Sequence, residues 1–315
     1  MTTKIKSNIT ELIGNTPLFH PARWLAHKGI ANEGFAFKME SYNITGSVKD
    51  RAALGMILDL EERGILKEGM TIIEPTSGNT GISLAALAAA RGYKAIFCLP
   101  DTMSVERRKF LGAYGGQLVL TPGADGMKGA MAKAKELNEE IDGSVIPSQF
   151  SNPANPGYHQ QSTGPEIWEQ TDGKVDVLVF GIGTGGTLTG AARHIKELNP
   201  DIEVIAVEPT SSAVISGEEP GKHGIQGIGA GFIPENLDME YVDRVVTVTT
   251  EEAIAEGRAL AQQEGILAGI SSGAALAASA KVMADESYKD KVIVTVLPDS
   301  GDRYLSTALF AESEA

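Results

Sequence analysis

From residue 35 onward, short apolar runs alternate with longer segments in which apolar positions recur at helical spacing. A short apolar run between turn residues is typical of a buried strand, and the longer spacing is typical of an amphipathic helix. Up to residue 146 the pattern predicts helix 47–63, strand 70–74, helix 79–91, strand 95–99, helix 104–114, strand 117–120, helix 126–140 and a strand near 144–146. Such alternation predicts an α/β fold with mostly parallel sheets flanked by helices.

The pattern breaks at residues 151–157, the richest cluster of turn residues in the chain. We take this cluster as a boundary between two lobes, because 315 residues exceed what one core usually supports. The alternation then resumes, with helix 158–170, strand 175–180, helix 187–198, strand 203–207, strand 244–248, helices 250–264 and 272–284, and strand 291–297. Residues 209–235 are rich in glycine and lack periodicity, which predicts a long functional or mobile loop.

Composition excludes several functions. The chain has 41 acidic and 27 basic residues, a net charge of -14, so its surface repels nucleic acid and anionic lipid. The single cysteine, Cys98, forms neither an intrachain disulfide nor a zinc cluster, and the five histidines lack metal-ligand spacing. No run of about 18 apolar residues is present, and the N-terminus lacks the apolar core of a signal peptide. We therefore expect a cytoplasmic protein without a metal or a membrane span.

Lys49 lies in the stretch Asn43–Arg51, which opens the predicted helix 47–63. The partial positive charge of a helix N-terminus disfavours a protonated amine there. A neutral amine can form a Schiff base with an aldehyde, which suggests that Lys49 holds pyridoxal phosphate. The alternative is a solvated surface lysine.

The turn at residues 76–81, Thr-Ser-Gly-Asn-Thr-Gly, follows a predicted strand and precedes a helix. Glycine lets the backbone approach a ligand, and the hydroxyls, the amide and the helix N-terminus supply donors for an anion such as a carboxylate. The alternative is an ordinary capped turn, since Ser, Thr and Asn are preferred helix caps.

A second turn, residues 181–187, reads Gly-Ile-Gly-Thr-Gly-Gly-Thr and suits a phosphate at the start of the next helix. Gly181, Gly183 and Gly186 also match the dinucleotide fingerprint. Glu208 stands about where the ribose-binding acid of a dehydrogenase would be. An NAD-dependent dehydrogenase is therefore a rival interpretation, although it leaves Lys49 and the turn at 76–81 without a role.

A third turn, residues 269–275, leads into a helix with Ser271 near its start. A serine hydroxyl can hydrogen-bond a pyridine nitrogen without protonating it, which leaves the ring a weaker electron sink than a carboxylate partner would. Such a ring suits β-elimination and replacement better than transamination. A simple helix cap is the alternative here too.

At this point the chain resembles a known family, the cysteine synthases (O-acetylserine sulfhydrylases) among the tryptophan-synthase-β-like, fold type II pyridoxal-phosphate enzymes. The resemblance extends almost from end to end. Its matching motifs are GNTP at 14–17, GSVKDR at 46–51, EPTSGNTG at 74–81, MSVERR at 103–108, QFSNPANP at 149–156, TGPEIW at 163–168, GIGTGGTLTG at 181–190, IQGIGAGFIP at 225–234, GILAGISSGA at 265–274 and RYLST at 303–307.

Carried over position by position, the resemblance assigns the cofactor residues. It implies that Lys49 is the Schiff-base lysine and catalytic base, that Asn79 binds the 3′-oxygen, and that Ser271 is the partner of the pyridine nitrogen. It places Gly227 in the loop that lines the cofactor. The implied phosphate loop consists of Gly183, Thr184, Gly185, Gly186 and Thr187. Glu208 then becomes an incidental strand-end acid.

The resemblance also assigns the substrate residues and the lobes. The implied ligands of the substrate α-carboxylate are Thr76, Ser77, Thr80 and Gln149. Residues 46–151 would form a smaller mobile lobe that binds this carboxylate. Residues 1–45 and 152–315 would form a larger lobe that binds the cofactor phosphate and pyridine ring.

The implied reaction converts O-acetyl-L-serine and sulfide to L-cysteine and acetate through an aminoacrylate. The resemblance further implies a homodimer that can bind the C-terminal tail of serine acetyltransferase. One departure concerns substrate choice, because the family usually has Asn-Pro-Gly-Gly before Ser-Val-Lys, whereas this chain has Asn43-Ile44-Thr45-Gly46. It leaves related reactions open, with O-phosphoserine, with thiosulfate, or with serine plus homocysteine.

Overall fold

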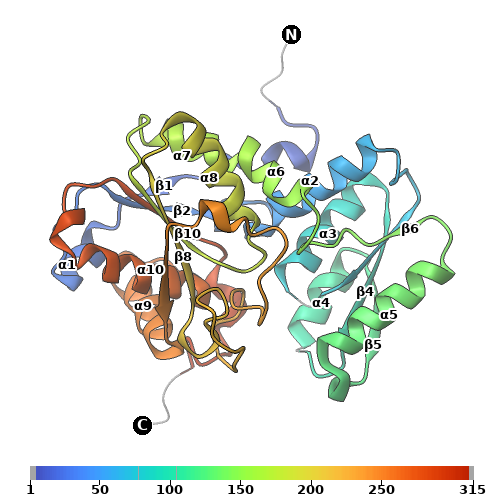
Figure 1. Cartoon of the computed structure of the whole chain (residues 1–315). Coiled ribbons are helices and arrows are strands. Elements are labelled where there is room, and N and C mark those ends of the chain that lie inside the picture. The colour runs from blue at the N-terminus through green and yellow to red at the C-terminus, as the bar shows by residue number, and fades with distance from the viewer. Residues whose placement is uncertain (1–4, 77, 104, 312–315) are drawn as a thin grey trace. The chain divides into compact units, whose positions relative to one another are not determined.

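The structure is a computed structural model that describes residues 5–76, 78–103 and 105–311 (Figure 1). Within these residues the chain divides into two compact units. The smaller unit combines the segment that ends at Ile13 with Lys49–Asn155, and the larger unit combines Gly14–Val48 with the chain from Pro156 onward.

These units differ in their bounds from the lobes expected at 46–151 and at 1–45 plus 152–315. The N-terminal segment groups with the smaller unit because its 3-10 helix η1 (Ile9–Leu12) packs against α3 (Asn79–Arg91). No local sequence pattern signals this contact, since the two helices lie about 70 residues apart in the chain.

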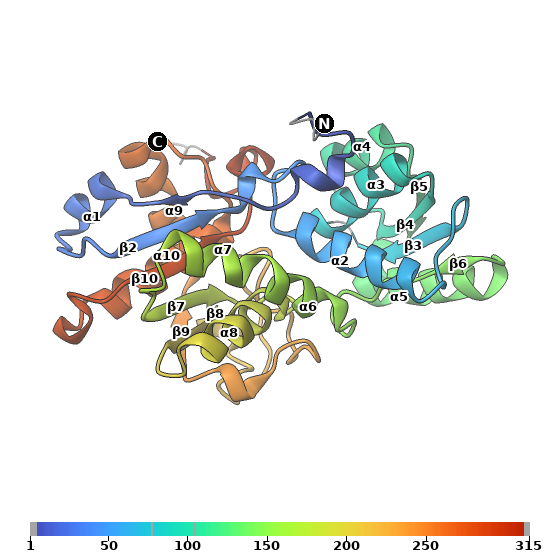
Figure 2. The same cartoon turned by 90° about the horizontal axis from the view of Figure 1, so that it is seen from above.

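The smaller unit contains a parallel sheet with the strand order β5-β4-β3-β6. Its strands are β3 (Thr71–Pro75), β4 (Lys94–Pro100), β5 (Gln117–Thr121) and β6 (Ser144–Val145). Its helices are α2 (Lys49–Glu62), α3, α4 (Val105–Ala113) and α5 (Gly126–Glu140). Ile73 and Ile96 pack against Ala130 and Ala134 of α5, while α2 and α3 lie on the opposite side of the sheet (Figure 2).

The larger unit contains a mixed sheet with the order β1-β2-β10-β7-β8-β9, in which β1 runs antiparallel to β2 and the pairings from β2 to β9 are parallel. Its strands are β1 (Leu18–Phe19), β2 (Phe35–Met39), β7 (Val177–Gly181), β8 (Glu203–Pro209), β9 (Arg244–Val248) and β10 (Ile293–Leu297). Its helices are α1 (Ala22–Lys28), α7 (Thr163–Gln170), α8 (Gly186–Leu198), α9 (Thr250–Glu264) and α10 (Ile270–Met283), and α6 (Ala154–Gln161) crosses from the smaller unit.

Both faces of the larger sheet are buried, and for that reason its strands read as continuous apolar runs. Along β7, Val177 and Val179 join the core formed with α9 and α10, whereas Leu178 and Phe180 join the core formed with α7 and α8. The period of two along a strand sends neighbouring side chains to opposite faces. The predicted α/β fold with mostly parallel, helix-flanked sheets is confirmed.

The prediction of one helix over residues 158–170 is wrong. The structure has α6 and α7, separated at Ser162. Pro165 lies in the first turn of α7, where its missing N–H costs nothing, whereas within a longer helix it would remove a hydrogen bond.

Two of the three turns singled out by the sequence follow the carboxyl ends of parallel strands, whereas the third, residues 269–275, lies between α9 and α10. Residues 76–78 follow β3, residues 182–185 follow β7, and the approach to Lys49 follows β2. In the larger unit Met39 of β2 lies opposite Leu297 of β10, so their carboxyl ends share one edge of the sheet. Ligands of open parallel sheets bind at that edge.

Candidate active site

Lys49 is the first residue of α2 and is half-buried, so the prediction that it opens a helix is confirmed. The next residue, Asp50, is fully buried, and its carboxylate accepts a hydrogen bond of 2.5 Å from the Ser83 hydroxyl. Ser83 Oγ also lies 3.1 Å from the carbonyl oxygen of Asn79, the first residue of α3. The Asp50–Ser83 bond therefore ties the start of α2 to the start of α3 within the smaller unit.

The turn before α3 offers backbone donors at a helix start. Its cap residue, Gly78, is extended and makes no side-chain cap. Thr76 is buried, and its hydroxyl oxygen accepts a hydrogen bond of 3.3 Å from the Gly78 N–H. A Cβ on Gly81 would lie 2.8 Å from Thr76 Cγ2, so the turn packs too closely for a side chain there. Ser77, a predicted carboxylate ligand, lies outside the described residues.

Gln149 reaches this turn from far along the chain. Thr80 Oγ1 donates a hydrogen bond of 2.6 Å to Gln149 Oε1, and both side chains are buried. The Gln149 carbonyl oxygen accepts a bond of 2.9 Å from Asn155 Nδ2, which holds the segment in place. The structure therefore brings Thr76, Thr80 and Gln149 together in the smaller unit.

The glycine turn of the larger unit lies between β7 and α8. Gly185 caps α8 with a φ of +83°, a conformation that favours glycine. A Cβ on Gly183 would lie 2.4 Å from the carbonyl oxygen of Gly227, so these two loops touch along their backbones. The amides of residues 183–187 stand at the start of a thirteen-residue helix, an arrangement that suits a phosphate.

Ser271 lies in the first turn of α10 and is 3% exposed. Its neighbour Gly227 has a φ of +99°, and a Cβ there would lie 3.4 Å from Ser271 Oγ. Among the described residues, the Ser271 hydroxyl has no hydrogen-bond partner in the protein. The larger unit therefore brings Gly183, Gly227 and Ser271 together.

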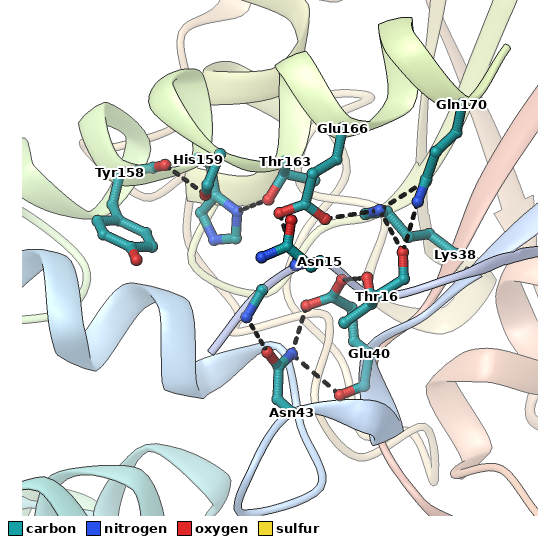
Figure 3. Close-up of polar contacts among 12 residues, drawn as sticks. Asn15, Thr16, Lys38, Glu40, Asn43, Tyr158, His159, Thr163, Glu166 and Gln170 are labelled. Atoms are coloured by element: carbon teal, nitrogen blue, oxygen red, sulfur yellow. Dashed lines mark hydrogen bonds and ion pairs between the residues drawn. The ribbon is translucent and has the colours of Figure 1, made fainter. Parts of the chain in front are cut away.

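Sequence reasoning missed His159, which the structure places behind the phosphate turn. His159 is 1% exposed, with its Nδ1 at 2.7 Å from Thr163 Oγ1 and its Nε2 at 3.3 Å from Thr187 Oγ1 (Figure 3 shows the first contact). The spacing of His159 and Thr163, one helical turn apart, is visible in the sequence, but the contact with Thr187, 28 residues away, is not.

A buried polar network fixes the segment that leads to Lys49 (Figure 3). Asn43 Oδ1 accepts a bond of 2.8 Å from the Gly14 N–H, and its Nδ2 donates a bond of 2.7 Å to Glu40 Oε2. Glu40 also accepts a bond of 2.7 Å from Thr16 Oγ1. The GNTP motif at 14–17 therefore anchors the approach to the lysine.

The departure from the family pattern lies in this approach. Thr45 is buried and its carbonyl oxygen accepts a hydrogen bond from the Arg303 guanidinium, whereas Ile44 is 45% exposed. Gly46 has a φ of +79°, and the Val48 N–H donates a bond of 2.8 Å to the Pro298 carbonyl oxygen. The threonine is therefore part of the fold of this segment.

Glu208 does not behave as a ribose ligand. It is 1% exposed, and its carboxylate accepts hydrogen bonds from the Ile215 N–H at 2.8 Å, the Ser216 N–H at 3.0 Å and the Ser216 hydroxyl at 2.6 Å. These bonds fold the loop after β8 back onto the strand. The Glu208 carboxylate is used in hydrogen bonds within the protein, which removes the main support for a dehydrogenase.

Neither a metal cluster nor a membrane-spanning helix occurs in the part of the chain that the structure describes. Across it, His, Cys, Asp and Glu side chains form no cluster of three or more suited to a metal ion. The helices within it are all too short or too polar to cross a membrane.

Comparison with known proteins identifies the family. Residues 9–299 match the family described as "Pyridoxal-phosphate dependent enzyme". The chain belongs to this family. It is 55% identical to "Cysteine synthase A" of Salmonella typhi over 98% of this chain and 97% of that protein. The crystal structure of cysteine synthase from Entamoeba histolytica superimposes with a TM-score of 0.93 at 42% identity, covering 100% and 94% of the two chains. That of O-ureido-L-serine synthase superimposes with a TM-score of 0.91 at 43% identity, covering 99% and 98%.

The described residues fit the family's cofactor. The helix start at residues 183–187 offers amides to a phosphate, and Gly183 lies so close to Gly227 that a side chain would not fit there. Ser271 offers a buried hydroxyl without a protein partner among these residues, suited to a pyridine nitrogen. Lys49 offers an amine at a helix start.

Proposed function

We propose that this protein is a cysteine synthase that exchanges the acetate of O-acetyl-L-serine for sulfide, giving L-cysteine with pyridoxal 5′-phosphate as cofactor. The observation that carries the proposal is the buried Thr80–Gln149 pair beside the uncapped start of α3, which is tied to the helix of Lys49 through Asp50 and Ser83. A carboxylate-binding turn beside an amine is what a β-replacement on an amino acid requires. The 55% identity to a cysteine synthase A supports the choice of reaction.

In this proposal the cofactor is held by the residues that the resemblance assigns to it. Lys49 would bond covalently to its aldehyde carbon, and Asn79 would hydrogen-bond its 3′-oxygen. Gly183, Thr184, Gly185, Gly186 and Thr187 would bind its phosphate. Gly227 would line the ring, and Ser271 would hydrogen-bond the pyridine nitrogen. When bound, the ring withdraws the electron pair left at the substrate Cα.

The protein's own residues perform the remaining steps. Thr76, Ser77, Thr80 and Gln149 bind the substrate α-carboxylate and so orient its Cα–H bond. The Lys49 amine, which the substrate amine would displace from the cofactor's aldehyde carbon, takes the Cα proton as general base. The Cβ–O bond then breaks and acetate leaves with the electron pair. Hydrosulfide forms the new Cβ–S bond, and Lys49 returns its proton to Cα. We expect the smaller lobe to be mobile during this cycle and to exclude water from the reacting carbons.

Spectroscopy of the purified protein tests this function. We expect a visible band from bound pyridoxal phosphate that shifts to the red with O-acetyl-L-serine and returns when sulfide is added. Lys49→Ala should lose the original band and turnover. If that variant kept the band, the assignment of Lys49 would be wrong. Titration with NAD(H) should show no binding, which would remove the dehydrogenase.

The departure at Ile44-Thr45 keeps a second candidate, the same β-replacement with another pair of substrates. The fold of this chain is shared at 43% identity with O-ureido-L-serine synthase, so one scaffold accommodates different nucleophiles. Turnover with O-phosphoserine, with thiosulfate, and with serine plus homocysteine should be compared with turnover of O-acetylserine and sulfide. A preference for any of these pairs would replace the first candidate.

Three further properties belong to the proposal. The lone cysteine, buried and with a pKa raised by burial to about 11, is compatible with a reducing cytoplasm. A homodimer is expected from the resemblance and would be measured by light scattering. The C-terminal tail of serine acetyltransferase carries a carboxylate, the group that the turn at 76–81 is proposed to bind, so a synthetic tail peptide should compete with substrate.

A further inference from the structure

Glu74 lies behind the proposed carboxylate site and has no role in the steps above. It is the fourth residue of β3 and is 2% exposed. Its carbonyl oxygen accepts a hydrogen bond of 3.1 Å from the Thr76 N–H, and the Ser148 N–H interacts with its carboxyl group and favours the ionised form. The carboxyl oxygen Oε2 is buried and has no hydrogen-bond partner among the described residues.

These contacts connect the two segments that form the site, the turn at Thr76 and the segment of Ser148 and Gln149. Ser148 has a φ of +59°, unusual for a residue with a side chain, and its carbonyl oxygen accepts bonds from the N–H groups of Ser151 and Asn152. The Ser148 turn directly precedes Gln149, which contacts Thr80. Glu74 therefore contacts both segments. Its backbone contacts the Thr76 turn, and its carboxyl group contacts Ser148, the residue before Gln149.

Burial disfavours a charge at this position. Removal from water raises the pKa of Glu74 from its ordinary value of 4.5 to about 8, although the hydrogen bond from the Ser148 N–H opposes the rise. At pH 7 the carboxyl group is therefore mostly neutral. An ionised Glu74 would carry an unpaired charge in a medium of low dielectric constant, behind a site that must accept a second carboxylate.

The elements packed against β3 supply no compensating cation. They are β4, β6, α3 and α5. The Cys98 thiol of β4 stays neutral over the working range, because burial raises its pKa to about 11. Arg91 of α3 is paired with Glu61. The remaining titratable groups of these elements are Lys94 on β4 and, on α5, Lys128, Lys133, Lys135, Glu136, Glu139 and Glu140. None of them is among the causes of the shift at Glu74.

We propose that Glu74 is a positioning residue of the substrate-carboxylate site and acts in its neutral form. It holds the Ser148–Gln149 turn against the turn at Thr76 without placing a negative charge behind the bound carboxylate. When Glu74 loses its proton, the site repels the substrate and substrate affinity falls. This inference rests on the proposed function, because it takes the substrate to be an amino acid bound by these two segments.

Ligand binding to the holoenzyme as a function of pH tests the proposal. The probe is L-serine, which carries the substrate carboxylate and amine but a poor leaving group, and binding is read from the shift of the visible cofactor band between pH 6.5 and 9.5. Glu74→Gln mimics the neutral acid, and Glu74→Leu removes the acceptor for the Ser148 N–H. Glu139→Gln is the matched control, since that acid is exposed on α5.

We expect Glu74→Gln to bind L-serine like the wild type at pH 6.5 and more tightly than the wild type above pH 8. Above pH 8 the ratio of the wild-type to the variant dissociation constant should rise about tenfold per pH unit, because binding then requires Glu74 to take up one proton. The amine of L-serine titrates equally in both proteins and cancels in this ratio. Glu74→Leu should bind more weakly at every pH, and Glu139→Gln should follow the wild type.

A ratio that stays constant from pH 6.5 to 9.5 would overturn the inference. If Glu74→Gln fails to fold, infrared spectroscopy of the wild type tests the inference instead. A neutral Glu74 should give the band of a buried carboxylic acid at pH 7, and this band should disappear above pH 9. Absence of that band would equally overturn the inference. A protein that shows no cofactor band, or no response to amino acids at any pH, would instead refute the proposed function itself.

Discussion

At the scale of single residues, His159 shows how a histidine outside the ligand site can set its geometry. Its two ring nitrogens contact Thr163 and Thr187, and only one of them carries the proton in the neutral ring. The short Thr163 contact favours one arrangement of protons and so determines whether Nε2 donates to or accepts from the Thr187 hydroxyl. That hydroxyl is at the start of α8, where the proposed phosphate binds.

We expect His159→Ala to release pyridoxal phosphate about tenfold faster than the wild type, since a buried hydrogen bond to Thr187 is lost. Thr163→Val should act in the same direction with a smaller effect, because it frees the ring to adopt the other tautomer. Release is measured by ultrafiltration and absorbance of the freed cofactor, without reference to turnover. His27→Ala, an exposed histidine on α1, is the control. Equal release rates from all four proteins would contradict a role for His159.

At the scale of elements, the packing of α6 against α8 depends on one glycine. A Cβ on Gly190 would lie 2.3 Å from the Pro156 carbonyl oxygen and 2.5 Å from His159 Cβ. Both clashes involve atoms held by the backbone, so no flexible side chain can move aside. The close approach brings His159 to Thr187, which joins the packing of these helices to the chemistry of the phosphate turn.

Gly190→Ala should lower the free energy of unfolding by about 1–3 kcal/mol through overpacking. Gly157→Ala on α6 is a matched control, since a Cβ added there would have nothing within 4 Å and the backbone is helical. The control should be neutral or stabilising by about 0.5–1 kcal/mol. Urea unfolding of both variants measures the difference. A Gly190→Ala protein as stable as Gly157→Ala would mean that α6 and α8 can separate without cost.

The sequence predicted those elements whose ends carry local signals. The bounds of α9 are confirmed to the residue, because Thr249 and Glu252 form a capping box and Gly265 ends the helix. The short β1 and α1 were missed, since two or seven residues are too few to show a period. The starts of α2, α3 and α8 were placed within two residues by their turns. Glu74 and His159 stayed hidden, because their contacts with Ser148 and Thr187 join distant parts of the chain.

At the scale of the whole molecule, Glu74 differs from the buried groups that form ion pairs. Lys38 is fully buried and forms an ion pair of 2.8 Å with Glu166, while Lys28 pairs with Glu256 at 2.6 Å. In each pair the ammonium group of the lysine directly faces a carboxylate. An unpaired buried acid behaves differently, because folding then binds a proton that the unfolded chain has released.

The free energy of unfolding should therefore depend on pH through Glu74. Its pKa rises from 4.5 in the unfolded chain to about 8 in the folded protein, so between these values the folded state binds more protons. The contribution of Glu74 is fully present below about pH 4.5 and is lost as the pH rises through 8, a change of about 3–5 kcal/mol. Glu74→Gln cannot titrate, so its free energy of unfolding should rise relative to that of the wild type by this amount between pH 5 and pH 8.5.

Urea unfolding at saturating cofactor measures both proteins. Glu139→Gln is the control and should show the same pH dependence of the free energy of unfolding as the wild type. A constant difference between wild type and Glu74→Gln would mean that Glu74 is ionised in the folded protein, and the Ser148 turn would then have to stabilise a carboxylate.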